Sequence, residues 1–188
     1  MTHLVRPAGP EDLDAAADVL AAAFDRYSWT RWSIPADDYS HRLKALQRLY
    51  LGHALKHGIV LVEARLRAVA AFLPPGAPAP DEPAEREIAA LHGSRLAVLG
   101  ALRLPAPPTE AWTLETVGVD PAHQGAGLGS AVTLAGLETA GEHGAPVALE
   151  TSDERNVRLY QRLGFETTAT TFVQSGPTVY SMLRAAAA

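Results

Sequence analysis

The apolar residues of the chain alternate between a helical spacing and a strand spacing. Helical spacing predicts helices over residues 11–24, 37–56, 82–102 and about 128–140, and a shorter one that follows a capping box at 151–154 and ends at Gly164. Segments rich in Val, Ile, Thr and aromatic residues predict strands at 3–6, 59–64, 68–73, 112–119, 146–150, 166–173 and 178–184. The order βααββαβαβαββ therefore predicts an α/β fold.

One break in this pattern separates the first two predicted helices. Residues 25–35 read as a loop that carries Tyr27, Trp29 and Trp32, so two of the three tryptophans of the chain lie in it. These rings either cover the core or form an aromatic wall for a substrate, because loops on a rigid scaffold commonly carry binding residues.

The stretch from Trp112 to Glu150 carries the strongest chemical signal. A predicted strand ends at Asp120, and Gly125, Gly127 and Gly129 follow at the first turn of the next helix. Glycines leave backbone N–H groups uncovered, and the N-terminus of a helix attracts anions. The following strand completes a βαβ unit that is suited to holding a phosphate.

Composition narrows the class of protein further. The 188 residues suffice for one domain, which we expect to span residues 1–188. The net charge of −5 argues against nucleic acid as a partner and is compatible with a cationic substrate. There is no apolar run of the roughly 18 residues that a membrane span needs, and no signal-peptide pattern, so we expect a cytoplasmic protein with no membrane partner. Without cysteine or a metal-binding histidine spacing, we expect no metal.

The glycine loop matches neither G-x-x-x-x-G-K-[ST] nor G-x-G-x-x-G, which bind nucleotides. Its order, Gln124-x-x-Gly127-x-Gly129, instead resembles the pyrophosphate arm of the GNAT superfamily of acyl-CoA N-acyltransferases. Within that superfamily the chain is most similar to the puromycin N-acetyltransferases, in the segments Leu20–Phe24, His92–Leu96, Thr116–Val119, His123–Val132, Leu149–Ser152 and Tyr160–Phe165.

This resemblance implies the GNAT fold, with a mixed central β-sheet flanked by helices, and acetyl-CoA as the cosubstrate. It implies that the amide of Val117 polarises the acyl carbonyl, and that the cofactor is held by Val117, Gly118, Val119, Gln124, Gly125, Ala126, Gly127, Leu128, Gly129 and Ser130. Many members have a cofactor-binding asparagine seven residues before the catalytic tyrosine. Here that position is Asp153, and Asn156 lies one turn away, so both are candidates.

Two residues are candidates for acid–base catalysis. Tyr160 occupies the position of the superfamily's general-acid tyrosine in Leu-Tyr-x-x-Leu-Gly-Phe, where it would donate a proton to the departing thiolate. Glu115 lies two residues before Val117 on the same predicted strand, where a carboxylate could take the proton that the amine must lose. Tyr160 could alternatively be a core residue, and Glu115 a solvated strand residue.

Three functions remain open at this point. The first is an N-acetyltransferase that acts on the primary amine of a small molecule, such as a puromycin-like aminonucleoside. The second is acetylation of a protein N-terminus or a lysine, and the third is a non-catalytic acyl-CoA sensor. The aromatic residues Tyr27, Trp29 and Trp32 favour a closed pocket for a small molecule, and Tyr160 disfavours a sensor. The sequence does not fix the oligomeric state.

Overall fold

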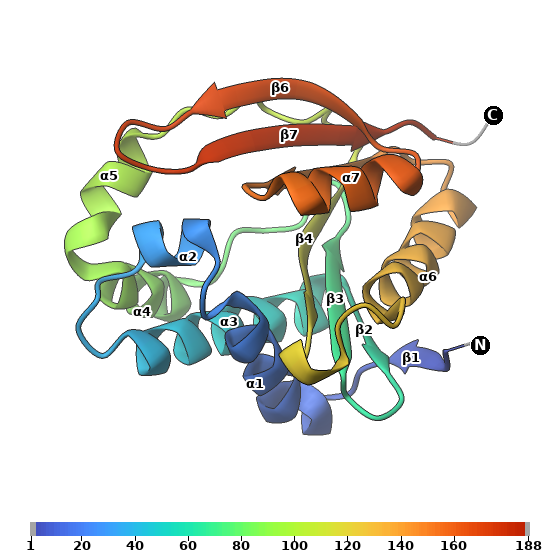
Figure 1. The fold of residues 1–188 in the computed structure, drawn as a ribbon, viewed down its shortest axis with the longest axis horizontal. Helices are drawn as coiled ribbons and strands as arrows, with labels where there is room; N and C mark the ends of the chain where they lie inside the picture. Colours follow the sequence, from blue (N-terminus) through green and yellow to red (C-terminus); the bar gives the residue numbers. More distant parts are fainter. Residues whose placement is uncertain (1–2, 187–188) are drawn as a thin grey trace.

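The structure, a computed structural model, describes residues 3–186 (Figure 1). Its strands are β1 (Val5–Pro7), β2 (Ile59–Glu63), β3 (Ala68–Leu73), β4 (Trp112–Val119), β5 (Val147–Thr151), β6 (Glu166–Phe172) and β7 (Thr178–Arg184). They form a seven-stranded sheet in the order β1-β2-β3-β4-β5-β7-β6. The β4–β5 pair is parallel and the other pairs are antiparallel, which confirms the expected mixed sheet.

Helices cover both faces of this sheet (Figure 1). They are α1 (Leu13–Phe24), α2 (Ser28–Ser33), α3 (Tyr39–His57), α4 (Glu82–His92), α5 (Leu96–Ala101), α6 (Leu128–Glu142) and α7 (Glu154–Arg162), with single turns η1 (Pro10–Asp12), η2 (Gly93–Arg95) and η3 (Pro121–His123). Side chains alternate along β3: Val69 and Ala71 pack with α1 and α3, whereas Ala70 and Phe72 pack with α6. At Gly136, α6 approaches the sheet so closely that a Cβ would lie 2.1 Å from the Phe72 ring.

The pairing between β4 and β5 is short. It covers two positions on each strand and ends with Thr113 opposite Ala148. Beyond this point the two strands have no paired residues, and we call this region the β4–β5 split. On its other side β5 pairs along its whole length with β7, so the split is a gap inside an otherwise continuous sheet.

A β-bulge lies beside the split. In the β3–β4 ladder, the consecutive residues Ala71 and Phe72 oppose Thr116 and Leu114, so Glu115 is the extra, unpaired residue. A bulge bends its strand and redirects the side chain at that position. The bend accounts for the divergence of β4 from β5 and places Glu115 at the opening.

Two predicted segments are corrected by the structure. Residues 25–35, expected to be a loop, contain α2, and the Thr30 hydroxyl donates to the carbonyl oxygens of Phe24 (2.7 Å) and Tyr27 (2.9 Å) to fix its start. Residues 82–102, expected to be one helix, are divided into α4, η2 and α5. The division occurs because Gly93 has φ of +47°, a left-handed conformation that an α-helix does not accommodate.

The N-terminal end of α7 differs from the prediction, and its C-terminal end agrees with it. The predicted capping box at 151–154 is wrong, because Thr151 belongs to β5 and Asp153 caps the helix by accepting a hydrogen bond from the Arg155 N–H (2.7 Å). At the other end Gly164 has φ of +88°, which confirms the expected left-handed cap.

Neither a membrane span nor a metal cluster is found in residues 3–186. None of the helices there has the length and apolarity needed to cross a bilayer. Likewise, no three His, Asp or Glu side chains of the described chain come together as metal ligands.

Candidate active site

A cavity of about 530 Å³ lies at the β4–β5 split. That volume falls within the range of about 300–1,000 Å³ that is usual for small-molecule sites. Helices α1 to α5 supply one wall, and β4, β5 and α7 supply the other. Its aromatic and ionisable lining residues are Phe24, Tyr27, Trp29, Tyr50, His92, Glu115, Glu150 and Tyr160.

Two carboxylates, Glu115 of β4 and Glu150 of β5, line the cavity. Both side chains reach water through its opening, so they are only partly desolvated. Even so, partial desolvation by the surrounding protein atoms raises the pKa of Glu115, and the charge of Glu150 raises it further. Desolvation also raises the pKa of Glu150. The pair makes the cavity anionic and moves the proton affinity of Glu115 toward the range of a useful general base.

The predicted aromatic residues divide into two roles. Tyr27 and Trp29 line the cavity, whereas Trp32 lies behind Trp29, with 5.2 Å between the ring centroids. The Trp32 indole occupies the space beside Gly176 in the β6–β7 turn, where a Cβ would lie 2.8 Å from it. Trp32 therefore packs between Trp29 and the hairpin, outside the cavity lining.

Tyr27 also ties the two walls of the cavity together. Its hydroxyl oxygen accepts a hydrogen bond from the Ser152 N–H (2.7 Å) and is 3.0 Å from Thr151 Oγ1. Since Tyr27 precedes α2, Thr151 ends β5 and Ser152 follows it, this contact spans the open side of the split.

Tyr160 of α7 lines the cavity from the opposite side. It is 7% exposed, and its ring meets Phe165 edge-on with 5.6 Å between centroids. Burial raises the pKa of its hydroxyl, with a smaller contribution from Tyr27. The hydroxyl is therefore protonated at neutral pH and able to donate.

Residues 124–129, which we call the glycine arm, follow the C-terminal end of β4. Gly125 and Gly127 have φ of +79° and +80°, a conformation that side-chain-bearing residues rarely adopt. Gly127 is the N-cap of α6, and amides in the first turn of a helix have no partner within it. Ser130 lies in that turn, while Leu128 is 2% exposed and packs in the core. At Gly129 a Cβ would lie 3.3 Å from Val119 Cγ2.

Neighbouring side chains stabilise the arm. The Gln124 side-chain amide donates to the Val119 carbonyl (3.3 Å), and His3 Nε2 lies 2.7 Å from the Ala126 carbonyl oxygen. Since a carbonyl only accepts, His3 is the donor. These contacts tie the arm to the end of β4 and to the chain before β1.

The other four predicted residues differ in their surroundings. Val117 lines the cavity, but a Cβ at Gly118 would lie 2.6 Å from Leu20 Cδ2, so Gly118 serves the packing of α1 on β4. Asp153 is engaged by its capping bond and by Arg155 (2.9 Å), which lowers its pKa. Asn156, and not Asp153, lies on the cavity wall.

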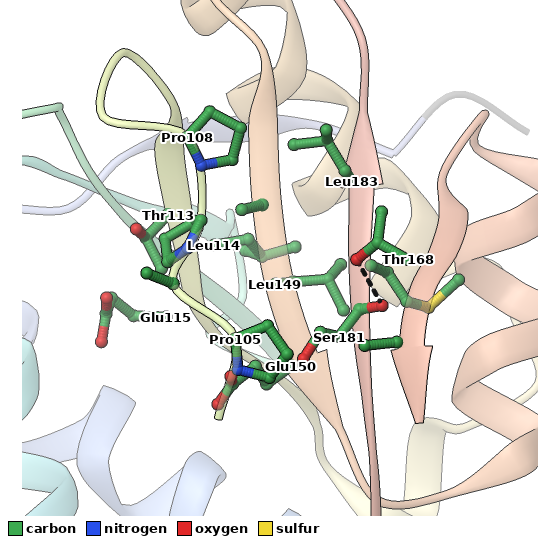
Figure 2. Close-up of a pocket in the computed structure, with 15 residues that line it drawn as sticks. Pro105, Pro108, Thr113, Leu114, Glu115, Leu149, Glu150, Thr168, Ser181 and Leu183 are labelled. Atoms are coloured by element: carbon green, nitrogen blue, oxygen red, sulfur yellow. Dashed lines mark hydrogen bonds between the residues drawn. The ribbon is translucent and has the colours of Figure 1, made fainter. Parts of the chain in front are cut away.

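A second cavity of about 510 Å³ lies between the 105–108 segment and strands β4, β5 and β7 (Figure 2). It shares Leu114, Glu115 and Glu150 with the first cavity. The two carboxylates therefore stand where the two cavities meet.

Sequence reasoning missed Glu150, Tyr50 and His92, which all line the first cavity. Glu150 carried a usable signal, because it ends a predicted strand parallel to the one that holds Glu115. Tyr50 and His92 had only helical periodicity around them, which does not reveal that α3 and α4 meet at the same opening.

Comparison with known proteins shows which family this chain resembles. Residues 77–165 match the model of the Acetyltransferase (GNAT) family. A crystal structure described as histone acetyltransferase HPA2 and related acetyltransferase, from Corynebacterium glutamicum, is similar with a TM-score of 0.81 and 26% identity, over 100% of this chain and 98% of that one. This chain has the GNAT fold, and its residues 77–165 are similar to the GNAT acetyltransferase family. The GNAT fold expected from the glycine arm is thereby confirmed.

Comparisons with further acetyltransferases show how far the similarity extends. An N-acetyltransferase from Staphylococcus aureus Mu50 shares the fold with a TM-score of 0.67 at 16% identity, covering 96% of this chain and 99% of that one. A mycothiol acetyltransferase from Nocardiopsis dassonvillei is 40% identical over 81 residues, which are 42% of this chain and 24% of that protein. One from Streptosporangium roseum is 50% identical over 52 residues, 26% of this chain and 15% of that protein. The matches thus span less than a quarter of these curated relatives.

Proposed function

We propose that this chain is an acetyl-CoA-dependent N-acetyltransferase that acts on the primary amine of a small molecule. The observation that supports it is the placement of Glu115 and Tyr160 in one cavity at the β4–β5 split. Transfer to an amine needs a base for the proton that nitrogen loses and an acid for the departing sulfur. The raised pKa of Glu115 suits a base that works near neutral pH, and Tyr160 is protonated and able to donate.

The residues present fit an acyl-CoA. The left-handed glycines Gly125 and Gly127 expose the first-turn amides of α6, which suit a pyrophosphate. Val117 lies on the cavity wall where β4 has lost β5 as a partner, so its backbone can reach an acyl carbonyl. Acetyl-CoA supplies the acetyl group activated as a thioester.

The chain's own groups then handle two protons. Glu115 accepts the proton of the attacking amine, and Tyr160 donates a proton to the sulfur as the carbon–sulfur bond breaks and the amide bond forms. We propose that both events take place in a ternary complex, in which the amine attacks the thioester directly between the two groups that line the cavity.

The cavity favours a cationic amine that carries an aromatic or planar group. Glu115 and Glu150 attract the charge, and the rings of Phe24, Tyr27 and Trp29 offer stacking surfaces. A puromycin-like aminonucleoside has these features and is our first candidate acceptor, acetylated in the cytoplasm as a route to antibiotic resistance. The names of the curated relatives make mycothiol-type acceptors a second candidate.

A turnover assay tests the proposal. Release of coenzyme A thiol is followed with a thiol reagent, against puromycin, other aromatic amines and short peptides. A mycothiol-type amine carries a thiol of its own, so its acetylation is followed by the mass of the product. The chain has no cysteine, so the protein gives no background signal. Turnover of small aromatic amines supports the proposal. Acetylation of peptides alone would favour a protein acetyltransferase, and acetyl-CoA binding without any turnover would favour a sensor.

A further inference from the structure

His92 and Tyr50 form a hydrogen-bonded pair in the cavity wall that the chemistry above does not use. His92 ends α4, is 9% exposed, and has Nδ1 2.8 Å from the carbonyl oxygen of Ser33 at the end of α2. Its other ring nitrogen, Nε2, lies 3.4 Å from the hydroxyl of Tyr50 on α3. His92 and Tyr50 both line the 530 Å³ cavity.

The Ser33 carbonyl determines the direction of these hydrogen bonds. A carbonyl oxygen only accepts, so His92 Nδ1 carries the proton. In the neutral imidazole Nε2 is then an acceptor, and the Tyr50 O–H must be its donor. A phenol has one proton, so the Tyr50 oxygen has only lone pairs left to offer to the cavity.

Glu115 is the second acceptor in this part of the cavity. It lines the same cavity from the opposite wall. Burial raises the pKa of the Tyr50 hydroxyl, and the charge of Glu115 raises it further. A primary amine has at least two N–H groups and can donate to both residues at once. An alcohol has one O–H and leaves one of the two acceptors without a donor from the substrate, so it forms one hydrogen bond fewer than the amine.

We propose that His92 fixes the Tyr50 hydroxyl as a hydrogen-bond acceptor, and that Tyr50 and Glu115 together form an acceptor-only amine site that selects primary amines over alcohols. This inference rests on the proposed function and names the feature of the cavity that sets its specificity. Tyr50 contacts the amine, and His92 is a positioning residue that acts through Tyr50.

Three variants test the pair by steady-state kinetics. Tyr50→Phe removes the hydroxyl and keeps the ring, so KM for the amine should rise about tenfold, as expected for one lost hydrogen bond to a charged group. KM for acetyl-CoA should stay within twofold. In His92→Asn the side-chain amide can still donate to Ser33 but Nε2 is gone, so amine KM should rise similarly. The double variant should be no worse than Tyr50→Phe, because both changes remove one interaction.

Two further measurements separate this role from a structural one. Tyr180→Phe, which deletes a hydroxyl that contacts Glu154 outside the cavity lining, should leave both KM values unchanged. Nitrogen-15 NMR should show the proton of His92 on Nδ1 and not on Nε2, and the Nε2 shift should change in Tyr50→Phe. Amines should also lose their rate advantage over matched alcohols in the Tyr50 variant.

The outcomes separate the two proposals. If the wild type acetylates amines but Tyr50→Phe keeps its amine KM, or if His92 carries its proton on Nε2, the amine site is overturned and the acetyltransferase proposal stands. Additive effects in the double variant would likewise overturn the action of His92 through Tyr50. A wild type that acetylates no amine overturns the proposed function and the amine site together, whatever the NMR result.

Discussion

Glu115 and Glu150 stand at matching positions, each two residues beyond the last paired position of its strand. In a continued ladder they would be side-by-side neighbours on parallel strands. Because the pairing ends at Thr113 and Ala148, both carboxylates instead face the opening between the strands. Their interaction is repulsive, and it is one cause of the raised pKa of Glu115.

Neutralising Glu150 should therefore change the pH dependence of activity. In Glu150→Gln the like charge is gone, the pKa of Glu115 falls, and Glu115 remains an ionised base to lower pH. We expect the acidic limb of kcat/KM to move to lower pH, which a pH–rate profile measures. A limb that stays in place, or moves to higher pH, would mean that Glu150 does not act on the catalytic base.

Removing the base itself should have a different signature. Glu115→Gln should lower kcat/KM by roughly 10²–10⁴-fold near neutral pH. The loss should shrink at high pH, where the amine is already deprotonated. The comparison of wild type and variant from pH 6 to pH 10 checks this. An equal loss at all pH values would indicate that Glu115 positions the substrate and does not take its proton.

Tyr160→Phe isolates the proposed acid. The ring keeps its contact with Phe165, so the melting temperature and acetyl-CoA affinity should change little. The loss should appear in kcat, at roughly 10²–10⁴-fold, because the hydroxyl acts only as the thiolate leaves. Retention of most of the wild-type kcat would leave Tyr160 with a packing role alone.

The glycine arm can be tested against a matched glycine at the other end of the same helix. Gly127→Val places a branched side chain at φ of +80°, where the cofactor phosphate would approach. Calorimetry should show acetyl-CoA affinity falling at least tenfold, about 1.4 kcal/mol. Gly144, with φ of +61°, follows the C-terminal end of α6, so Gly144→Val controls for backbone strain. Equal effects of the two substitutions on affinity would count against a phosphate site.

Substitution of Trp29 and of Trp32 should have different effects, because only Trp29 lines the cavity. Trp29→Ala removes a cavity wall and should raise KM for the amine by roughly 2–30-fold, corresponding to about 0.5–2 kcal/mol, with KM for acetyl-CoA within threefold. Trp32→Ala removes the support between Trp29 and Gly176 and should also lower the melting temperature. If Trp29→Ala weakens acetyl-CoA as much as the amine, the aromatic wall does not belong to the acceptor side.

Much of this architecture could be predicted because it follows from local rules. Alternation of apolar residues located the strands, Gly164 marked a helix end, and the glycine arm with Tyr160 pointed to the superfamily. The bulge at Glu115 could not be predicted, because it depends on how β4 pairs with β3 and not on β4 alone. For the same reason the register that matches Glu150 to Glu115 is visible only once the sheet is assembled.

The break between α4 and α5 and the short helix α2 could not be predicted from the sequence either. Periodicity continued across Gly93, since one glycine is compatible with a helix until its φ becomes positive. Six-residue α2 is too short for a periodic signal, and it is held by Thr30 hydrogen bonds to the end of α1. That error matters for the site, because α2 carries Trp29 and the Ser33 carbonyl that orients His92.

The two-residue contact between β4 and β5 also has a mechanical consequence. Strands β1–β4 form one ribbon with their own ladders, and β5–β7 form another, so the centre of the sheet is joined by far fewer backbone hydrogen bonds than either half. The covalent link between the ribbons runs through α6, whose close approach at Gly136 clamps it to the first of them. The relative position of the two ribbons therefore depends on side-chain contacts across the split, such as those of Tyr27 with Thr151 and Ser152 and of Trp32 with Gly176. A molecule bound in the split would add contacts to both ribbons and stabilise this arrangement.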